Sequence, residues 1–190
     1  MDIAIVGATG NVGRKTLEVL EKKELPINNV YLVASSKSAG KKISFKGKDL
    51  EVFDLENFDF SKVKITFFAA GGKISEKFAE KAAQHCLVID NSSFYRMDPN
   101  VPLIVPQVNS NHLKNIKRNI IANPNCSTSQ LVIALKPLHD EFVIKRIVVS
   151  TYQSVSGGGK APMDELIEQT KLVLNGKKVK SKNFTKQIAF

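Results

Sequence analysis

The chain has 190 residues, 43% of them apolar, with a formal net charge of +10 and two cysteines. That length supports a sizeable hydrophobic core in one large domain, or in one domain plus part of a second. The sequence predicts neither a membrane span, since no apolar run approaches roughly 20 residues, nor a disulfide framework. Because the first residues already read as a strand, we expect no signal peptide and a cytoplasmic location. We expect no metal site.

The positive charge is compatible with a nucleic-acid binder, with anionic substrates, or with a lysine-rich surface. Much of the excess lies near the end of the chain, in Lys177, Lys178, Lys180, Lys182 and Lys186. This segment lacks the interleaved aromatic residues of single-strand binders. We therefore favour the last two explanations and expect no nucleic-acid partner and no membrane partner.

The amino terminus has the order that a dinucleotide-binding fold requires. An apolar strand over residues 3–6 leads into the glycine loop GATGNVG and then into a helical pattern over residues 16–20. Gly7 permits a tight turn, Gly10 lets the backbone approach a pyrophosphate, and Gly13 lets the helix pack closely on the strand. The spacing is GxxGxxG rather than GxGxxG, so the leading strand carries much of this interpretation.

The loop after the second predicted strand, residues 30–33, indicates which dinucleotide binds. An NAD enzyme would place a carboxylate there, roughly 20 residues after the glycine loop, to bind the ribose hydroxyls. The sequence has Ser35, Lys37 and Ser38 instead. Hydroxyls and an ammonium suit a 2′-phosphate, so we predict NADP, although a solvated polar loop would have the same composition.

Strands and helices alternate through the middle of the chain. Residues 43–45 and 50–53 suggest a hairpin-like insertion, residues 63–70 and 86–90 are apolar strands, and Ser75 is predicted to cap the helix between them. A short strand follows over residues 120–122. This alternation predicts an α/β fold with a doubly wound, mostly parallel Rossmann-type sheet. Ligands should collect where its strands end, at Gly7, Ser35, Gly71, Asn91 and Cys126.

Cys126 is the strongest chemical signal. Pro124 and two asparagines disfavour regular structure before it, and a helical pattern follows it, so we expect Cys126 to open a helix. Unpaired N–H groups and the macrodipole at a helix N-terminus favour an anion, here the reactive thiolate. A buried structural cysteine is the commoner case, but the polar neighbours of Cys126 argue against it. Cys86 lies in an apolar strand and reads as an ordinary core residue.

The last third of the chain is predicted to begin a second domain. Residues 145–155 read as a long strand, and a glycine-rich segment and a helix through residues 166–172 follow. The spacing in the glycine-rich segment excludes a Walker loop. We predict a nucleotide-binding domain over residues 1–125 and the first part of an α+β catalytic and dimerisation domain over residues 126–190. Because the sequence ends on an apolar run, we expect it to be the first part of a longer protein.

Seven segments in this order resemble the aspartate-semialdehyde dehydrogenase family: GATGNVG, ASSKSAGK, FFAAGG, DNSSFYRMD, VPLIVPQVN, NPNCSTSQL and TYQSVSGGGK. They span essentially the whole chain. The resemblance implies reductive dephosphorylation of L-aspartyl 4-phosphate to L-aspartate 4-semialdehyde, through a cysteine thioester and with NADPH. It also implies a homodimer and a place in lysine, diaminopimelate, methionine and threonine biosynthesis.

The resemblance also implies roles for individual residues. Cys126 is the nucleophile, Gln153 orients the substrate beside the thiol, and phosphate is bound by Arg96 and Asn125. The pyrophosphate is cradled by Thr9, Gly10, Asn11 and Val12. The 2′-phosphate meets Ser35, Lys37 and Ser38, and the nicotinamide half is lined by Gly71, Ser156 and Gly157. Family members more often have arginine where Lys37 stands, so a bidentate grip is lost there while the charge is kept.

The acid/base histidine of the family and its carboxylate-binding arginine belong to a motif downstream of residue 190. His85, His112 and His139 do not replace that histidine, and losing a general acid/base costs about 10²–10⁴ in rate. We therefore expect these 190 residues to bind NADP with little turnover. The alternatives are a reductase resembling N-acetyl-glutamyl-phosphate reductase, an oxidoreductase of the glyceraldehyde-3-phosphate type, and a non-catalytic nucleotide-binding module.

Overall fold

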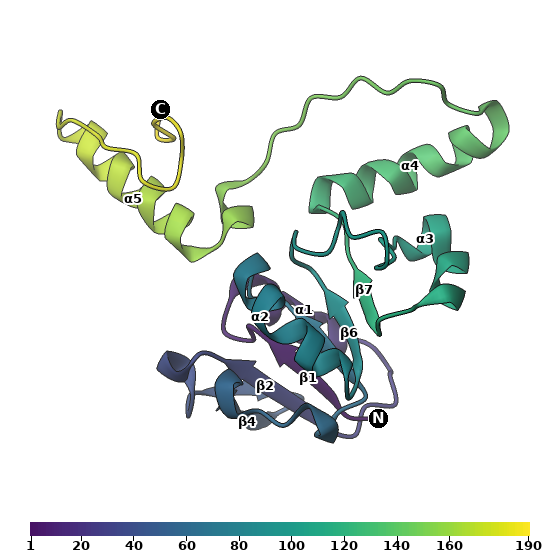
Figure 1. Cartoon of the computed structure of the whole chain (residues 1–190). Coiled ribbons are helices and arrows are strands. Elements are labelled where there is room, and N and C mark those ends of the chain that lie inside the picture. Colours follow the sequence, from purple (N-terminus) through teal and green to yellow (C-terminus); the bar gives the residue numbers. More distant parts are fainter. The chain divides into compact units, whose positions relative to one another are not determined.

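A computed structural model describes residues 1–190, apart from the side chain of residue 115 (Figure 1). The chain divides into two compact units, Met1–Val148 and Val149–Phe190, which are described separately. In this division the helix that starts at residue 126 belongs to the first unit. The domain boundary predicted after residue 125 rests on the sequence alone and stays a prediction.

The first unit is built on a seven-stranded sheet with the order β3-β4-β2-β1-β5-β6-β7. Every neighbouring pair is parallel except β3 and β4. The strands are β1 (Ile3–Val6), β2 (Val30–Ala34), β3 (Lys42–Phe45), β4 (Lys48–Asp54), β5 (Ile65–Phe68), β6 (Leu87–Asp90) and β7 (Ile120–Ala122). The predicted mostly parallel α/β sheet is confirmed.

Helices pack on both faces of the sheet, as a doubly wound fold requires. The helices of this unit are α1 (Asn11–Glu21), α2 (Gly72–Ala83), α3 (Pro106–Asn109) and α4 (Cys126–Phe142), with 3₁₀ turns at Ser36–Ser38, Leu55–Asn57, Phe60–Lys62 and Ser110–Asn115. Strand β1 lies at the centre and is buried on both sides, because successive side chains of a strand point to opposite faces. Ile3 and Ile5 join the core under α1, whereas Ala4 and Val6 join the core under α2.

The hairpin predicted around residues 46–49 is present, but it is not an insertion. Lys46 and Gly47 both have positive φ, 48° and 74°, which is the geometry of a tight two-residue turn. Strand β4 then pairs in parallel with β2. The hairpin therefore extends the main sheet and ends it with an antiparallel edge strand.

The predicted cap of α2 is wrong. The helix begins one turn earlier, with Gly71 at its N-cap, and Ser75 is a fully buried residue inside it. Its hydroxyl donates to Asp90 at the end of β6. A serine near the start of a predicted helix can be its N-cap, or it can be a buried residue that donates to a carboxyl group far away in the sequence, and the sequence alone does not distinguish the two.

The predicted strand over residues 145–155 is not formed. Residues 143–154 have no regular secondary structure, and Val148 and Tyr152 are largely exposed. A strand needs hydrogen bonds from a neighbour. Within the described chain, none of the paired strands includes residues 143–154.

The second unit consists of the 3₁₀ turn Val155–Gly158, helix α5 (Lys160–Leu174) and the segment that follows it. The predicted helix is confirmed. Two buried polar residues of α5 hold the terminal segment. Glu165 accepts hydrogen bonds from the backbone N–H groups of Lys182 and Asn183, at 2.8 and 2.6 Å, and Gln169 accepts one from Ile188 at 2.9 Å.

Candidate active site

The predicted ligand-binding edge of the first unit lies where its parallel strands end. Gly7 directly follows β1, Ser35 follows β2, Asn91 follows β6, and Gly71 and Cys126 come a few residues after β5 and β7. Strands β1 and β5 are neighbours, and the chain connections leave them toward opposite sides of the sheet. Ligands of open α/β sheets bind at such a switch point.

Two glycines make the first loop possible. Gly7 has φ of 85°, and a Cβ there would come within 2.7 Å of the Ala69 carbonyl oxygen. A Cβ on Gly13 would come within 2.2 Å of the Gly7 carbonyl oxygen. At Gly10, in contrast, the nearest atom would be 3.4 Å away. Gly7 and Gly13 are therefore needed by the fold itself, whereas Gly10 leaves open space at the start of α1.

Two helix N-termini face this edge without a side-chain cap. Helix α1 begins after Gly10 and α2 begins after Gly71, and neither N-cap residue supplies a capping hydrogen bond. The first N–H groups of a helix and the positive end of its dipole bind anions such as phosphate. The predicted pyrophosphate residues Thr9, Gly10, Asn11 and Val12 all lie at the start of α1. This backbone fits a dinucleotide.

The predicted 2′-phosphate residues form a short turn directly after β2. Ser35 is the N-cap of the 3₁₀ turn Ser36–Ser38, and Lys37 within it is exposed. The first acidic residue after this turn is Asp49, in β4 beyond the hairpin turn. A flexible ammonium at this position can reach a phosphate as a point charge.

Cys126 is the first residue of α4, as predicted, and its thiol is exposed. Asn125 caps the helix: its Oδ1 accepts hydrogen bonds from Ser127 N at 3.0 Å and Ser127 Oγ at 2.6 Å. The Cys126 Sγ atom lies 3.9 Å from the same Oδ1. The sulfur therefore belongs to the first turn of α4.

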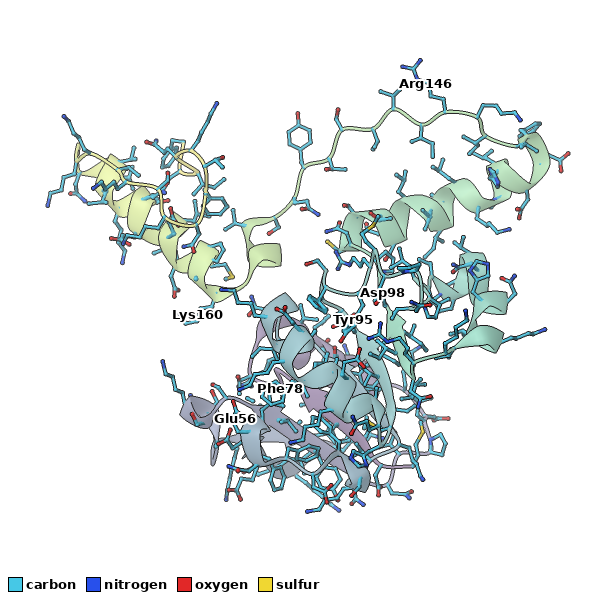
Figure 2. The ribbon with its side chains drawn as sticks, in the orientation of Figure 1. Glu56, Phe78, Tyr95, Asp98, Arg146 and Lys160 are labelled. Atoms are coloured by element: carbon cyan, nitrogen blue, oxygen red, sulfur yellow. The ribbon has the colours of Figure 1, made fainter. Side chains whose placement is uncertain are left out.

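Arg96 is held by backbone carbonyl groups of two loops. It lies on the turn after β6, on which Figure 2 labels Tyr95 and Asp98. Its Nε donates to the carbonyl of Asn123 at 2.9 Å, and its Nη2 donates to the carbonyl of Asn91 at 3.1 Å. Asn123 lies three residues before Cys126, so the Cα atoms of these two residues are at most about 11 Å apart.

The two loops that contact Arg96 are themselves joined. Asn123 Nδ2 donates to Asn91 Oδ1 at 2.8 Å, and Asn123 N donates to the carbonyl of Asp90 at 2.8 Å. The structure thus gathers Arg96, Asn125 and Cys126 at the ends of β6 and β7. Sequence patterns place Asn91 at this edge but do not indicate that Asn91 and Asn123 bond to each other and hold Arg96. Their only sequence signal was an asparagine directly after each strand.

The remaining predicted site residues belong to the second unit. Gln153 precedes the turn Val155–Gly158, and Ser156 and Gly157 lie within it. All three are exposed. Their predicted roles in orienting substrate and lining the nicotinamide stay predictions.

The three histidines are exposed and lie on separate elements. His85 follows α2, His112 is in the turn Ser110–Asn115, and His139 is in the last turn of α4. Cys86 is buried, its thiol contacts Thr66 Oγ1 at 3.2 Å, and burial raises its pKa. None of these residues contributes to the cluster around Arg96.

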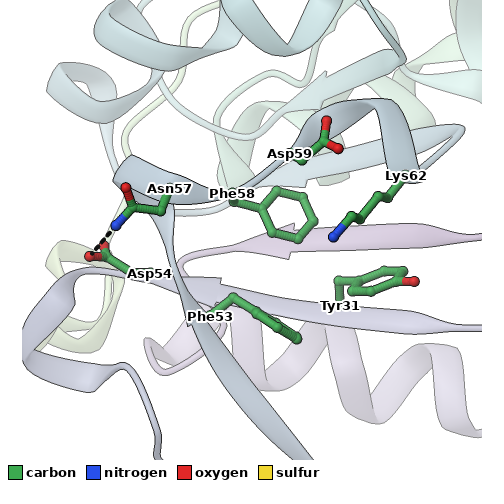
Figure 3. Close-up of a pocket in the computed structure, with 7 residues that line it drawn as sticks. All are labelled: Tyr31, Phe53, Asp54, Asn57, Phe58, Asp59 and Lys62. Carbon is green, nitrogen blue, oxygen red and sulfur yellow. Dashed lines mark hydrogen bonds between the residues drawn. The ribbon is translucent and has the colours of Figure 1, made fainter.

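A shallow pocket of about 140 Å³ lies elsewhere on the first unit (Figure 3). Tyr31, Phe53 and Phe58 line it, with ring centroids 5.8–6.1 Å apart, and Lys62 reaches toward the rings. It contains none of the predicted site residues. Among the described residues no His, Cys, Asp or Glu cluster could hold a metal ion. No helix in the described chain combines the length and apolarity needed to cross a bilayer.

Comparison with protein families gives two matches. The family model "Semialdehyde dehydrogenase, NAD binding domain" matches residues 2–116, and "Semialdehyde dehydrogenase, dimerisation domain" matches residues 135–190. The aspartate-semialdehyde dehydrogenase of Rickettsia conorii is 52% identical over the whole chain. The aspartate-semialdehyde dehydrogenase 2 of Vibrio cholerae is 50% identical, again over the whole chain.

Solved structures agree with these matches. The Vibrio cholerae aspartate semialdehyde dehydrogenase II complexed with ASA superimposes with a TM-score of 0.93 at 49% identity, covering 99% of this chain and 56% of that chain. A Candida albicans aspartate semialdehyde dehydrogenase with NADP gives a TM-score of 0.63 at 29% identity, covering 75% of this chain and 48% of that one. The chain spans 56% of the length of the Rickettsia relative and 57% of the Vibrio relative.

The glycine loop, the cysteine at the start of α4 and the matches along this chain all point to the same family. The chain belongs to the aspartate-semialdehyde dehydrogenase family.

Proposed function

We propose that these residues serve an NADP-dependent reductive dephosphorylation of L-aspartyl 4-phosphate to L-aspartate 4-semialdehyde. The Cys126 thiolate attacks the acyl carbon, inorganic phosphate leaves, and a thioester remains on the sulfur. When bound, NADPH would supply the hydride that converts this thioester into the aldehyde, and the Cys126 thiolate is released. In the reverse direction, phosphate cleaves the thioester after the hydride has left. The observation that carries the proposal is an exposed cysteine in the first turn of α4, three residues after the Asn123 carbonyl that anchors Arg96.

Arg96 fits the phosphate that leaves or attacks. A guanidinium remains charged at all working pH values and matches phosphate geometry with paired N–H donors. Its Nε and Nη2 each donate to a backbone carbonyl, which fixes the orientation of the guanidinium. The remaining N–H donors of the guanidinium can then bind an anion while the side chain keeps this orientation. Asn125 would assist from the N-cap, and Gln153 would orient the substrate beside the thiol.

NADP is the nucleotide that the residues favour. The uncapped start of α1 would hold the pyrophosphate, and Ser35, Lys37 and Ser38 would meet the 2′-phosphate. Gly71, Ser156 and Gly157 would line the nicotinamide half. The Candida relative with NADP supports this choice.

The wider setting follows from the family. The reaction serves lysine, diaminopimelate, methionine and threonine biosynthesis, and the protein works in the cytoplasm as a homodimer. The match of residues 135–190 to a dimerisation domain supports the homodimer. The exposed His85, His112 and His139 do not supply the acid/base group of the family. The 190 residues alone would therefore bind NADP and turn over slowly.

The test is phosphate-dependent reduction of NADP⁺ by L-aspartate 4-semialdehyde. We expect activity in a longer chain that continues these residues to the length of the relatives, and loss of that activity in Cys126→Ser. The 190-residue chain should bind NADPH but turn over at least about 10²-fold more slowly. Equal activity of the two chains would refute the expected slow turnover. Preference for N-acetyl-glutamate semialdehyde would identify the alternative reductase, and NADPH binding without turnover in the longer chain would identify a non-catalytic module.

A further inference from the structure

The proposed reaction leaves one fully buried carboxyl group without a role. Asp90 is the last residue of β6, and its exposed fraction is 0%. Its Oδ1 accepts from Ser75 Oγ of α2 at 2.7 Å and from Ser92 N at 3.0 Å, and its Oδ2 accepts from Ser92 Oγ at 2.7 Å. Burying a carboxyl group is costly unless such bonds satisfy it. The three bonds therefore tie α2, the end of β6 and the following turn into one arrangement.

The peptide group between Asn91 and Ser92 links this arrangement to Arg96. Its N–H donates to Asp90, and its C=O accepts from Arg96 Nη2 at 3.1 Å. A peptide group is planar, so fixing its N–H also fixes the direction of its carbonyl. Asp90 thus binds the N–H of the Asn91–Ser92 peptide group, and the C=O of the same group binds the Arg96 guanidinium.

A second connection runs through the serine side chain. Ser92 Oγ donates to Asp90 and also accepts from Phe94 N at 3.1 Å, two residues before Arg96. The carbonyl of Asp90 accepts from Asn123 N, and the Asn123 carbonyl accepts from Arg96 Nε. The carboxylate of Asp90 therefore holds the Asn91 carbonyl through one peptide plane, whereas the loop of Asn123 is tied to the backbone carbonyl of Asp90.

We propose that Asp90 is the positioning residue of the anion site: it holds the Asn91–Ser92 peptide plane and so aims the Arg96 guanidinium at the phosphate. This role rests on the proposed function of Arg96. Among the contacts of the described residues, Arg96 uses only Nε and Nη2. With Nε and Nη2 bound to carbonyls, the N–H groups of Nη1 are the donors that would bind the anion.

The chain contains a matched control for this geometry. Asp59 accepts from Ser61 N at 3.0 Å and from Ser61 Oγ at 2.7 Å, the same local pattern with the same spacing. Its contacts are exposed, and it caps the turn Phe60–Lys62, which has no contact with Arg96. Asp59→Ala and Ser61→Ala therefore remove the same type of interaction without affecting the anion site.

The experiment follows the Arg96 Nε–H signal by NMR in the 190-residue chain. In the unchanged chain this proton should be protected from exchange with water, because it is bonded to the Asn123 carbonyl. Asp90→Ala and Ser92→Ala should each speed its exchange by about tenfold, as expected when a hydrogen-bonded buried group is released. Exchange of the Ile5 amide, in the central strand, should be unchanged in Ser92→Ala, and both control variants should leave Arg96 unaffected.

Titration with inorganic phosphate separates this inference from the proposed function. Phosphate should shift the Arg96 signal in the unchanged chain and bind about tenfold more weakly in Ser92→Ala. Unchanged Arg96 protection in a folded Ser92→Ala chain would overturn the positioning role, even if Asp90→Ala does not fold. Exchange that rises equally at Arg96 and Ile5 would also overturn it, because that result indicates general loss of stability. Normal protection without any response to phosphate would instead contradict the role of Arg96 in the proposed function.

Discussion

Arg96 Nε donates a hydrogen bond to the carbonyl of Asn123 at 2.9 Å, three residues before Cys126. A mobile surface arginine loses side-chain conformational entropy when it binds a ligand. The Arg96 side chain is already ordered by carbonyls from two loops, so this loss is smaller. Preorganised donors stabilise charge that develops during a reaction without further reorganisation. This relationship links the turn after β6 to the helix that carries the thiol.

The first prediction concerns that anchored guanidinium. Arg96→Lys keeps the charge, but a single ammonium nitrogen lacks the planar fork whose separate nitrogens reach the two carbonyls and an anion. In the longer chain we expect the phosphate concentration for half-maximal rate to rise about tenfold or more. Arg146→Lys is the control, because Arg146 is exposed and lies outside the turn that carries Arg96. An equal effect of both substitutions would mean that phosphate responds to overall charge rather than to the site.

The second prediction separates two glycines of the first loop. Gly13→Ala places a Cβ against the Gly7 carbonyl and should destabilise the fold by about 1–3 kcal/mol, measured by urea unfolding. Gly10→Ala has room and an ordinary φ of −80°, so stability should change by less than about 1 kcal/mol. Its Cβ would stand where the pyrophosphate approaches, and NADPH affinity should fall. Unchanged NADPH affinity in Gly10→Ala would place the pyrophosphate elsewhere.

The third prediction tests the nucleotide preference. Lys37→Ala should weaken NADPH binding by about tenfold and leave NADH binding nearly unchanged, because only NADPH carries the 2′-phosphate. Lys41→Ala, another exposed lysine nearby, serves as the control. Fluorescence titration of both nucleotides measures the effect. If Lys37→Ala lowers both affinities equally, Lys37 does not read the 2′-phosphate.

The fourth prediction is a pH dependence in the second unit. Burial raises the pKa of Glu165, but donors from Lys182, Asn183 and Gln169 outweigh it and hold the pKa below its ordinary value of 4.5. Because the folded-state pKa is lowered, the stabilisation is complete above about pH 4.5 and is lost as the pH falls through the lowered value. Amide protection at Lys182 and Asn183 should therefore decrease on acidification.

The matched variants for this effect lie on the same helix. Glu165→Gln should lower the protection already at neutral pH and remove its dependence on acid. Glu168→Gln, which changes an exposed residue 3.6 Å from the Lys182 ammonium, should leave the acid dependence intact. Protection that persists to pH 2 in the unchanged chain would show that Glu165 does not hold the terminal segment.

Much of the first unit could be predicted because its signals are local. Apolar strands, glycine turns and helical spacing indicated β1, β2, β5, β6 and β7 and helices α1 and α2. The start of α4 at Cys126 follows from its flanking residues. Helix α3, between β6 and β7, was not predicted. The polar interior was not predictable in this way. Ser75 and Asp90 meet only after the sheet has assembled, and the carbonyls that hold Arg96 have no side-chain signature. The strand predicted over residues 145–155 failed for a related reason, since an apolar pattern does not supply the neighbouring strand.

The central claim is that the position of Cys126 activates its thiol. The most direct measurement is the rate of iodoacetamide alkylation at pH 7, determined by peptide mass spectrometry for each cysteine in the folded chain and in the chain unfolded by urea. Cys126 should react about tenfold faster in the folded chain. Cys86 should react more slowly when folded, because it is buried and its pKa is raised. If Cys126 reacts no faster in the folded chain than in the unfolded one, the site does not activate it and the account of Cys126 as nucleophile is contradicted.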